Sequence, residues 1–318
     1  MAIRRLYNAP RREHSSCCVA YLRQDWLLTP DGARLHFQVQ GKGEPAVALC
    51  DGLGCDGFAW KYLAPQLAET RRVVRWHYRG HGLSGVPDDR DRIGFQYTAD
   101  DLARVLDAAE VKSAIVFGHS MGVQVALEFH RRHPERVAGL VLICGSFGFP
   151  LDTFHDDTLL RRVFPYLHFL VELMPEAASR VMRFVARAEL TLRLALRYEV
   201  NADLLKKDDF VPYFEHLAQM DPLVFVRTLE SLAEHTAWDH LPHIDVPTLV
   251  IAGERDRFTP MWLSRRMADA IPNSELMIVP GGTHTATLEQ PQLIAERVER
   301  FIATRILEGP APALEPTG

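Results

Sequence analysis

The sequence lacks long hydrophobic runs. None of its apolar stretches approaches the ~20 consecutive residues that a helix needs to cross a bilayer. Arginines occur near the start of the chain, but no apolar segment long enough for a secretion signal follows them. We therefore expect a soluble protein of the cytoplasm.

Cysteine is also scarce, and neither sign of charge dominates. The five cysteines are odd in number and have no repeating spacing, which is not typical of a disulfide framework. The net charge of −5 gives no argument for nucleic acid binding, which needs a basic face or stripe. The sequence shows neither the ligand spacing of a metal site nor a phosphate-binding glycine loop. We therefore expect a small-molecule substrate, with no metal, no cofactor and no nucleic acid.

What the sequence does contain is an alternation of short apolar runs with helix-like stretches. Runs such as 46–50 and 114–117 are continuously apolar, which is typical of strands buried on both faces. Residues 97–109 have the apolar spacing of an amphipathic helix. The alternation predicts an α/β fold with a doubly wound, mainly parallel sheet, whose ligands bind outside the carboxyl ends of the strands.

The alternation divides the chain into four predicted parts. We expect a flexible arm over residues 1–23, a core formed by 24–144 and 222–307, and a disordered tail over 308–318. Residues 145–221 interrupt the pattern, because they are rich in Leu, Phe and Arg and contain no strand-like run. This interruption is predicted to be an inserted helical cap.

A serine lies in the turn between one predicted strand and the following helix. The strand leads directly into Gly118-His119-Ser120-Met121-Gly122, which is a G-x-S-x-G pattern. The two glycines allow a very tight turn, which lifts the serine hydroxyl above the sheet and places a helix N-terminus beneath it. We therefore predict that Ser120 is a nucleophile and that His119 packs beneath the site.

A serine hydroxyl needs a base, and two later loops supply candidates. One predicted strand is followed by Glu254 and Asp256, and the next strand is followed by His284. Both loops belong to the same edge of the predicted sheet as Ser120. We predict that His284 accepts the serine proton and that Asp256 orients its imidazole. Glu254 is the alternative acid.

The loop after the strand that ends at Cys50 is predicted to form part of an oxyanion hole. It begins Asp51-Gly52-Leu53, and the glycine would let the backbone turn an N–H group inward. The N–H groups of Leu53 and Met121 would then donate to the developing oxyanion. An ordinary glycine turn is the alternative interpretation.

Together these motifs resemble the α/β-hydrolase superfamily, especially its esterase, lipase and carbon–carbon hydrolase branches. The resemblance covers roughly residues 25–305 and includes residues 79–84, which are similar to the family's Asp-x-Arg-Gly-x-Gly-x-Ser stretch. Two positions depart from the family pattern, since Asp51 replaces a common His and His77 replaces a common Asp. We hypothesise that Asp51 and His77 form a polar pair that supports the oxyanion loop.

The resemblance implies a serine hydrolase that cleaves a carboxylic ester or thioester of a largely apolar molecule through an acyl-enzyme. Carbon–carbon bond hydrolysis or acyl transfer on the same triad is one alternative. A ligand-binding receptor or pseudo-enzyme that keeps the pocket is another. A serine at position 120 argues against the dehalogenase and epoxide hydrolase branches, whose nucleophile is an aspartate.

The predicted cap is both apolar and basic. Its Leu, Val and Phe residues are expected mainly to bury the cap against the core, with some of them lining an acyl pocket. Seven arginines face only three glutamates between Arg161 and Arg197. They form either a solvated helix face or a docking surface for an acidic carrier protein or an anionic membrane.

Overall fold

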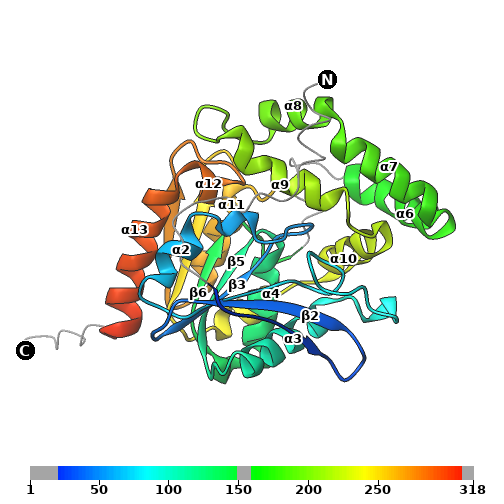
Figure 1. Cartoon of the computed structure of the whole chain (residues 1–318). Helices are drawn as coiled ribbons and strands as arrows, with labels where there is room; N and C mark the ends of the chain where they lie inside the picture. The colour runs from blue at the N-terminus through cyan, green and yellow to red at the C-terminus, as the bar shows by residue number, and fades with distance from the viewer. Residues whose placement is uncertain (1–20, 149–158, 310–318) are drawn as a thin grey trace, which may run out of the picture.

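A sheet of eight strands forms the centre of the computed structural model, which describes residues 21–148 and 159–309 (Figure 1). The strands are β1 (Tyr21–Leu28), β2 (Arg34–Gln40), β3 (Ala46–Cys50), β4 (Val73–Trp76), β5 (Ala114–His119), β6 (Val137–Ile143), β7 (Thr248–Gly253) and β8 (Ser274–Val279). Their order in the sheet is β1-β2-β4-β3-β5-β6-β7-β8. The pairs β1–β2 and β2–β4 are antiparallel, and the others are parallel. The predicted α/β fold with a mainly parallel sheet is confirmed.

The sequence patterns did not predict β1. This strand begins at Tyr21, inside the predicted arm over residues 1–23, and pairs only with β2 at the edge of the sheet. Trp26 and Leu28 remain 40% and 73% exposed, so the strand lacks the buried apolar pattern of its neighbours. The rest of the predicted arm and most of the predicted tail lie outside the described residues.

Helices cover both faces of the sheet. They are α2 (Leu63–Ala68), α3 (Phe95–Ala108), α4 (Met121–Arg132), α6 (Leu159–Leu173), α7 (Pro175–Arg187), α8 (Glu189–Tyr198), α9 (Lys207–Leu217), α10 (Pro222–Glu234), α11 (Met261–Ala270), α12 (Ala286–Glu289) and α13 (Pro291–Phe301). Shorter 3₁₀ segments occur at Phe58–Trp60, Arg90–Arg92, Pro134–Arg136 and Trp238–His243, and a π-helical segment at Ile302–Leu307. No described helix is long and apolar enough to cross a bilayer.

The alternation of side chains along each central strand builds two separate apolar layers. In β5, Ile115 and Phe117 belong to the layer that α2 and α13 cover, whereas Ala114 and Val116 belong to the layer that α3, α4 and α11 cover. All four side chains are fully buried. Because both faces are packed, the open places at which a ligand can reach the sheet are its edges and strand ends.

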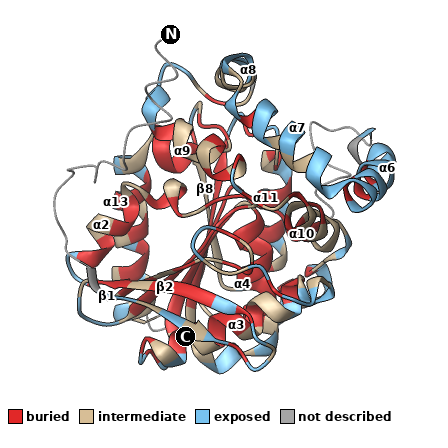
Figure 2. Ribbon diagram, turned by 45° about the vertical axis from the view of Figure 1, so that its right-hand side comes forward, coloured by how far each residue is buried: buried red, intermediate tan, exposed pale blue. Residues whose placement is uncertain are grey.

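Helices α6 to α9 follow β6 in the chain and precede α10, and we call these four the inserted helices. They lie together beyond one end of the sheet (Figure 1). Helix α6 contacts α10, and α9 contacts the 3₁₀ turn at Phe58–Trp60. Figure 2 shows α6, α7 and α8 at the periphery of the molecule with much of their length exposed. These helices occupy most of the segment 145–221 that the sequence predicted to be helical.

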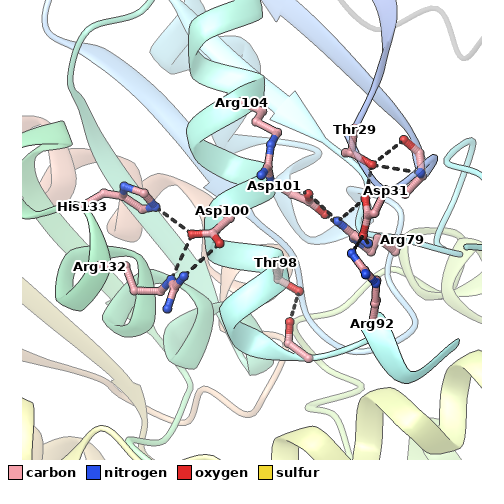
Figure 3. A network of polar contacts seen from close by, with 12 residues as sticks. Thr29, Asp31, Arg79, Arg92, Thr98, Asp100, Asp101, Arg104, Arg132 and His133 are labelled. Atoms are coloured by element: carbon pink, nitrogen blue, oxygen red, sulfur yellow. Dashed lines mark hydrogen bonds and ion pairs between the residues drawn. The ribbon is translucent and has the colours of Figure 1, made fainter. Parts of the chain in front are cut away.

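A buried arginine anchors the loop that follows β4. Arg79 donates to Asp101 of α3 at 2.6 and 2.8 Å and to Asp31 at 2.6 Å (Figure 3). The Arg79 guanidinium holds the pKa of Asp31 well below its usual value. Since Arg79 and Asp101 are both buried, their charges are neutralised by this fixed geometry and not by water. The motif at residues 79–84 therefore ties the end of β4 to α3.

Candidate active site

Ser120 occupies the single position between β5 and α4. Its backbone φ is +56°, which is uncommon for a residue with a side chain and costs about 1–3 kcal/mol. The turn is held because the Ser120 N–H donates to the Ile143 carbonyl at 3.0 Å. A Cβ at Gly118 would lie 2.3 Å from the Gly122 carbonyl oxygen, and one at Gly122 would lie 2.1 Å from the Cys50 carbonyl oxygen. Both glycines are therefore required by space.

Three loops at the carboxyl ends of β5, β7 and β8 bring Ser120, Asp256 and His284 together. The Ser120 Oγ lies 2.9 Å from His284 Nε2. The other ring nitrogen, Nδ1, lies 2.9 Å from Asp256 Oδ2 and 3.2 Å from Oδ1. An ionised carboxylate can only accept, so Nδ1 carries the hydrogen and Nε2 accepts from the serine hydroxyl. The arrangement can move a proton away from Ser120.

The Asp256 carboxylate is held in place by its own loop. It accepts from the Phe258 N–H at 2.9 Å, from the Thr259 N–H at 3.0 Å and from the Thr259 hydroxyl at 2.8 Å. Its side chain is 1% exposed. The alternative acid, Glu254, is exposed, and its carboxylate accepts from the Gly281 N–H at 2.7 Å. The contact with the imidazole therefore belongs to Asp256.

A cavity of about 370 Å³ opens at Ser120 and His284. Most of its lining is apolar or aromatic, and it includes Leu53, Phe58, Leu167, Val200, Phe210, Tyr213, Phe225, Leu229, Leu232 and Phe258. Among the described residues of the lining, Glu199 is the one acidic side chain, and there is no lysine or arginine. The cavity can hold an apolar group of a small molecule next to the serine hydroxyl.

The predicted oxyanion residues lie beside the serine. Leu53 lines the same cavity as Ser120, and Met121 begins α4 directly after it. Within the described residues, neither the Leu53 N–H nor the Met121 N–H has a hydrogen-bond acceptor. A Cβ at Gly52 would lie 3.2 Å from the Ser120 Cβ, so the loop after β3 packs directly against the turn. Two backbone donors are thus available next to the nucleophile.

The described residues offer no obvious place for a metal ion. Among them, no group of three or more His, Cys, Asp or Glu side chains is arranged to hold one.

The chain matches the model of a known protein family. Residues 45–291 match the model of the family described as alpha/beta hydrolase fold. The chain belongs to this family. It is 30% identical over 289 residues to a Caulobacter vibrioides protein named "Putative carbamate hydrolase RutD", a match that covers 88% of this chain and 99% of the relative.

Two further comparisons agree with this family. The chain is 30% identical over 278 residues to the 2-hydroxymuconate semialdehyde hydrolase of Pseudomonas sp. (strain CF600), with 86% of this chain and 91% of the relative covered. A crystal structure of a hydrolase from Pseudomonas aeruginosa PA01 superposes with a TM-score of 0.71 at 25% identity, covering 89% of this chain and 99% of that one. These three relatives are all named hydrolases, and this α/β hydrolase is accordingly an enzyme.

The hypothesised pair of Asp51 and His77 is wrong. Among the described residues, these two side chains form no hydrogen bond or ion pair with each other. His77 Nδ1 instead accepts from the Leu83 N–H at 2.9 Å, and its carbonyl accepts from the Ser84 hydroxyl at 2.7 Å. The ring lies so close to Gly82 that a Cβ there would be 2.4 Å from Nδ1. In this α/β hydrolase, His77 is held by its own downstream loop.

Asp51 is instead a buried carboxyl group with little support. Burial raises its pKa to about 7, and its Oδ1 has no hydrogen-bond partner among the described residues. The Tyr78 hydroxyl donates to the backbone carbonyl of Asp51 at 2.8 Å and so fixes the start of the loop after β3. Burial also lowers the pKa of His77 to about 3, which keeps that ring neutral. Burial therefore disfavours the charged form of both groups.

Sequence reasoning missed the groups that brace the His284 loop. His119 is buried as predicted, but its Nε2–H also donates to the His284 carbonyl at 2.9 Å. Burial lowers the pKa of His119 to about 4, so this ring is neutral at pH 7. The bond joins the serine turn to the histidine loop by a route that does not pass through the Ser120 hydroxyl.

Glu289 is the second missed brace. Its buried carboxylate accepts from the Thr283 N–H at 2.7 Å, from the Thr283 hydroxyl at 2.5 Å and from the Thr285 hydroxyl at 3.0 Å. It also accepts from the Asn201 N–H at 2.9 Å, which links α8 and its following turn to the same loop. The threonines that precede Glu289 were the available signal, because hydroxyl groups often bond to turns in this way.

Proposed function

We propose that this α/β hydrolase is a serine hydrolase that cleaves a carboxylic ester or thioester of a largely apolar small molecule. The observation that carries the proposal is the continuous contact of Ser120, His284 and Asp256, each step at 2.9 Å, at the mouth of an apolar cavity. Serine, imidazole and carboxylate in this order are the parts that acyl transfer needs.

The proposed reaction has two halves. In the first, the Ser120 oxygen attacks the carbonyl carbon, and His284 Nε2 takes the serine proton while Asp256 stabilises the charged imidazole. The N–H groups of Leu53 and Met121 donate to the oxyanion that forms. The tetrahedral intermediate collapses, the leaving alkoxide or thiolate receives the proton from His284, and an acyl-serine remains.

In the second half, a water molecule replaces the leaving group. His284 Nε2 takes a proton from the water as its oxygen attacks the acyl carbon, and the same two backbone N–H groups donate to the new oxyanion. Cleavage of the bond to the Ser120 oxygen then releases the carboxylic acid, and His284 returns the proton to Ser120. The enzyme ends in its starting state.

The lining of the cavity favours a substrate with an uncharged acyl group. The part of this lining that the structure describes is mostly apolar, with one acidic side chain and no lysine or arginine. An anionic substrate would find no counter-charge among these residues. Leu167, Val200 and Phe210 come from the inserted segment, and we propose that the inserted helices act as a cap over the substrate. We also propose that the protein is located in the cytoplasm. The buried thiols of Cys50, Cys55 and Cys144, which form no disulfide, agree with this location.

Carbon–carbon bond hydrolysis is the second candidate. It is favoured by the 30% identity to the relative named 2-hydroxymuconate semialdehyde hydrolase. Acyl transfer differs only in the nucleophile of the second half-reaction. The same triad would serve each of these reactions, so only the identity of the substrates distinguishes them.

A panel of aryl esters with acyl chains of increasing length tests the proposal. We expect hydrolysis by the wild type, a kcat/KM that rises with acyl length until the cavity is filled, and no turnover by Ser120→Ala. The matched control is Ser179→Ala, on α7, which should behave as wild type. Absence of turnover with every ester, or full activity of Ser120→Ala, would contradict the proposal.

A further inference from the structure

The inserted helices α6, α7 and α8 carry an unusual share of the exposed apolar surface. Among the described residues, thirteen of the twenty-two exposed large hydrophobic side chains lie between Leu159 and Leu194. Three aromatic side chains are the most conspicuous, since Tyr166, Phe169 and Phe184 are 73%, 62% and 76% exposed. Contiguous exposed apolar surface of this kind marks an interaction site in a soluble protein.

The apolar surface of α6 follows the helical period. One side of the helix carries Phe164 and Val171, which pack with Val226 of α10 and are nearly fully buried. The other side carries Val163, Tyr166, Leu167, Leu170 and Leu173, all exposed by 42% or more. The spacing of three and four residues places these side chains in one stripe. The helix is therefore apolar on a face that nothing in the described chain covers.

Helix α7 combines the same kind of face with a row of arginines. Ala178 and Ala186 face the protein, whereas Phe184 lies on the exposed side. Arg180, Arg183 and Arg187 recur at intervals of three and four residues, so they form a row next to Phe184.

Two arginines of α6 and α7 lack internal compensation among the described residues. Arg183 and Arg162 make no hydrogen bond or ion pair within the described part of the chain. Arg180 has an i,i+4 contact with Glu176, but its side chain remains 78% exposed.

The charge of this face is opposite to that of the whole protein. Residues 159–198 contain seven arginines and three glutamates, although the complete chain carries a net charge of −5. A second copy of the same face would bring like charges together, which disfavours self-association. An anionic partner is complementary, and the exposed aromatic and aliphatic side chains favour a lipid surface over a hydrated acidic protein.

We propose that α6, α7 and α8 dock on the surface of an anionic lipid bilayer. The apolar side chains of α6 and α7 would enter the boundary between headgroups and acyl chains, and the arginines would contact the lipid phosphates. Leu167 belongs to the exposed α6 stripe and also lines the cavity at Ser120. An apolar molecule held in the bilayer would thus find a lipid-facing side chain at the rim of the cavity.

Vesicle flotation with the full chain tests the docking. The probes are vesicles of phosphatidylcholine alone and of phosphatidylcholine mixed with phosphatidylglycerol. We expect binding to the mixed vesicles, weaker binding to the neutral ones, and release in high salt because the charges are then screened. Flotation needs no turnover, so failure of the proposed hydrolase activity would leave this result unchanged.

Two variants separate the apolar and the charged contributions. Phe184→Ser should lower the partition coefficient about tenfold, as expected for the lost burial of an aromatic side chain. Arg180→Gln with Arg183→Gln should lower it about five-fold for each charge removed. Leu28→Ser, 73% exposed on β1, and Arg300→Gln, exposed on α13, are the matched controls and should bind as wild type.

Four results would overturn the docking. One is no binding to mixed vesicles, and another is equal binding of wild type and all variants. A third is binding to polyglutamate without binding to vesicles, which would assign the face to an acidic protein. Light scattering that shows a dimer of the wild type and a monomer of Phe184→Ser would assign the face to a second copy and would also overturn it.

Discussion

The carboxyl edge of the sheet and the inserted helices differ in how their side chains are accommodated. Buried polar groups at the edge are hydrogen-bonded within the chain, whereas many apolar side chains on the helices remain exposed. At the edge, Asp256 and Glu289 are buried, and each accepts several hydrogen bonds from neighbouring loops. On α6 and α7, side chains such as Tyr166 and Phe184 are exposed, and no element in the described part of the chain covers them. The edge is therefore preorganised, whereas the helices present an exposed apolar surface, on which we propose that a lipid bilayer docks.

We expect the largest effect on kcat from a substitution of Asp256, whose buried carboxylate accepts several hydrogen bonds. Asp256→Asn keeps the shape of the side chain but replaces an oxygen that accepts from His284 with an amide, which stabilises the wrong tautomer of the ring. We expect kcat to fall about 10⁴-fold with little change in folding stability. Ester hydrolysis and thermal unfolding measure the two quantities. A loss of less than tenfold would show that Asp256 does not orient His284, and the exposed Glu254→Gln serves as the control.

Asp51 is the exception at the edge, because it is buried with an unpartnered oxygen. Its pKa is raised to about 7, so the native state holds a proton that the unfolded chain releases above its ordinary value of 3.8. Stability contributed by this proton is complete below pH 3.8 and is lost as the pH rises to about 7. Asp51→Asn should therefore be neutral at pH 4 and stabilising by about 2–4 kcal/mol at pH 8.

Denaturant unfolding of Asp51→Asn at these two pH values checks this expectation. The matched control is Asp88→Asn, an exposed aspartate that should give the same small difference at both pH values. If Asp51→Asn changed stability equally at pH 4 and pH 8, the carboxyl group of Asp51 would not be the source of the pH dependence.

Glu289 tests whether the brace behind His284 matters for the chemistry. Glu289→Ala leaves the N–H of Thr283 and the hydroxyl groups of Thr283 and Thr285 without their acceptor, so the loop can shift. We expect kcat to fall about 10- to 100-fold, since small displacements of a reacting group have effects of this size. Glu289→Gln should recover part of the rate. A change in KM with kcat unaltered would argue for a role in the cavity wall instead.

The smallest expected effect is on the stability of the inserted helices. Phe184 is 76% exposed, so Phe184→Ser should change the free energy of unfolding by no more than about 0.5 kcal/mol. Calorimetry measures this value, and Phe164→Ser, at a buried position of α6, is the contrasting variant and should cost several times more. Equal losses for both variants would show that Phe184 packs against the protein in solution.

The features that local patterns could predict are those that depend on strand ends. The strand before Ser120, and the strands before Asp256 and His284, are continuous apolar runs, so their loops were expected at one edge of the sheet. The structure brings these three residues together as expected. β1 escaped prediction because an edge strand with exposed side chains lacks such a run.

The features that could not be predicted depend on which way side chains face in three dimensions. Asp51 and His77 each directly follow one of two neighbouring strands, β3 and β4. His77 nevertheless bonds to Leu83 on its own loop. The exchange of acid and histidine relative to the family pattern could not predict this contact. The contact of Glu289 with Asn201 joins positions 88 residues apart. No local spacing encodes a contact between such distant parts of the chain.

The central claim is that Ser120 is an activated nucleophile, and covalent labelling with a fluorophosphonate tests it most directly. Mass spectrometry of the intact protein and of its peptides should show one adduct on the wild type, located on Ser120, and none on Ser120→Ala. His284→Ala should label far more slowly, because the serine then lacks its base. An unlabelled wild type, or equal labelling of wild type and Ser120→Ala, would contradict the account.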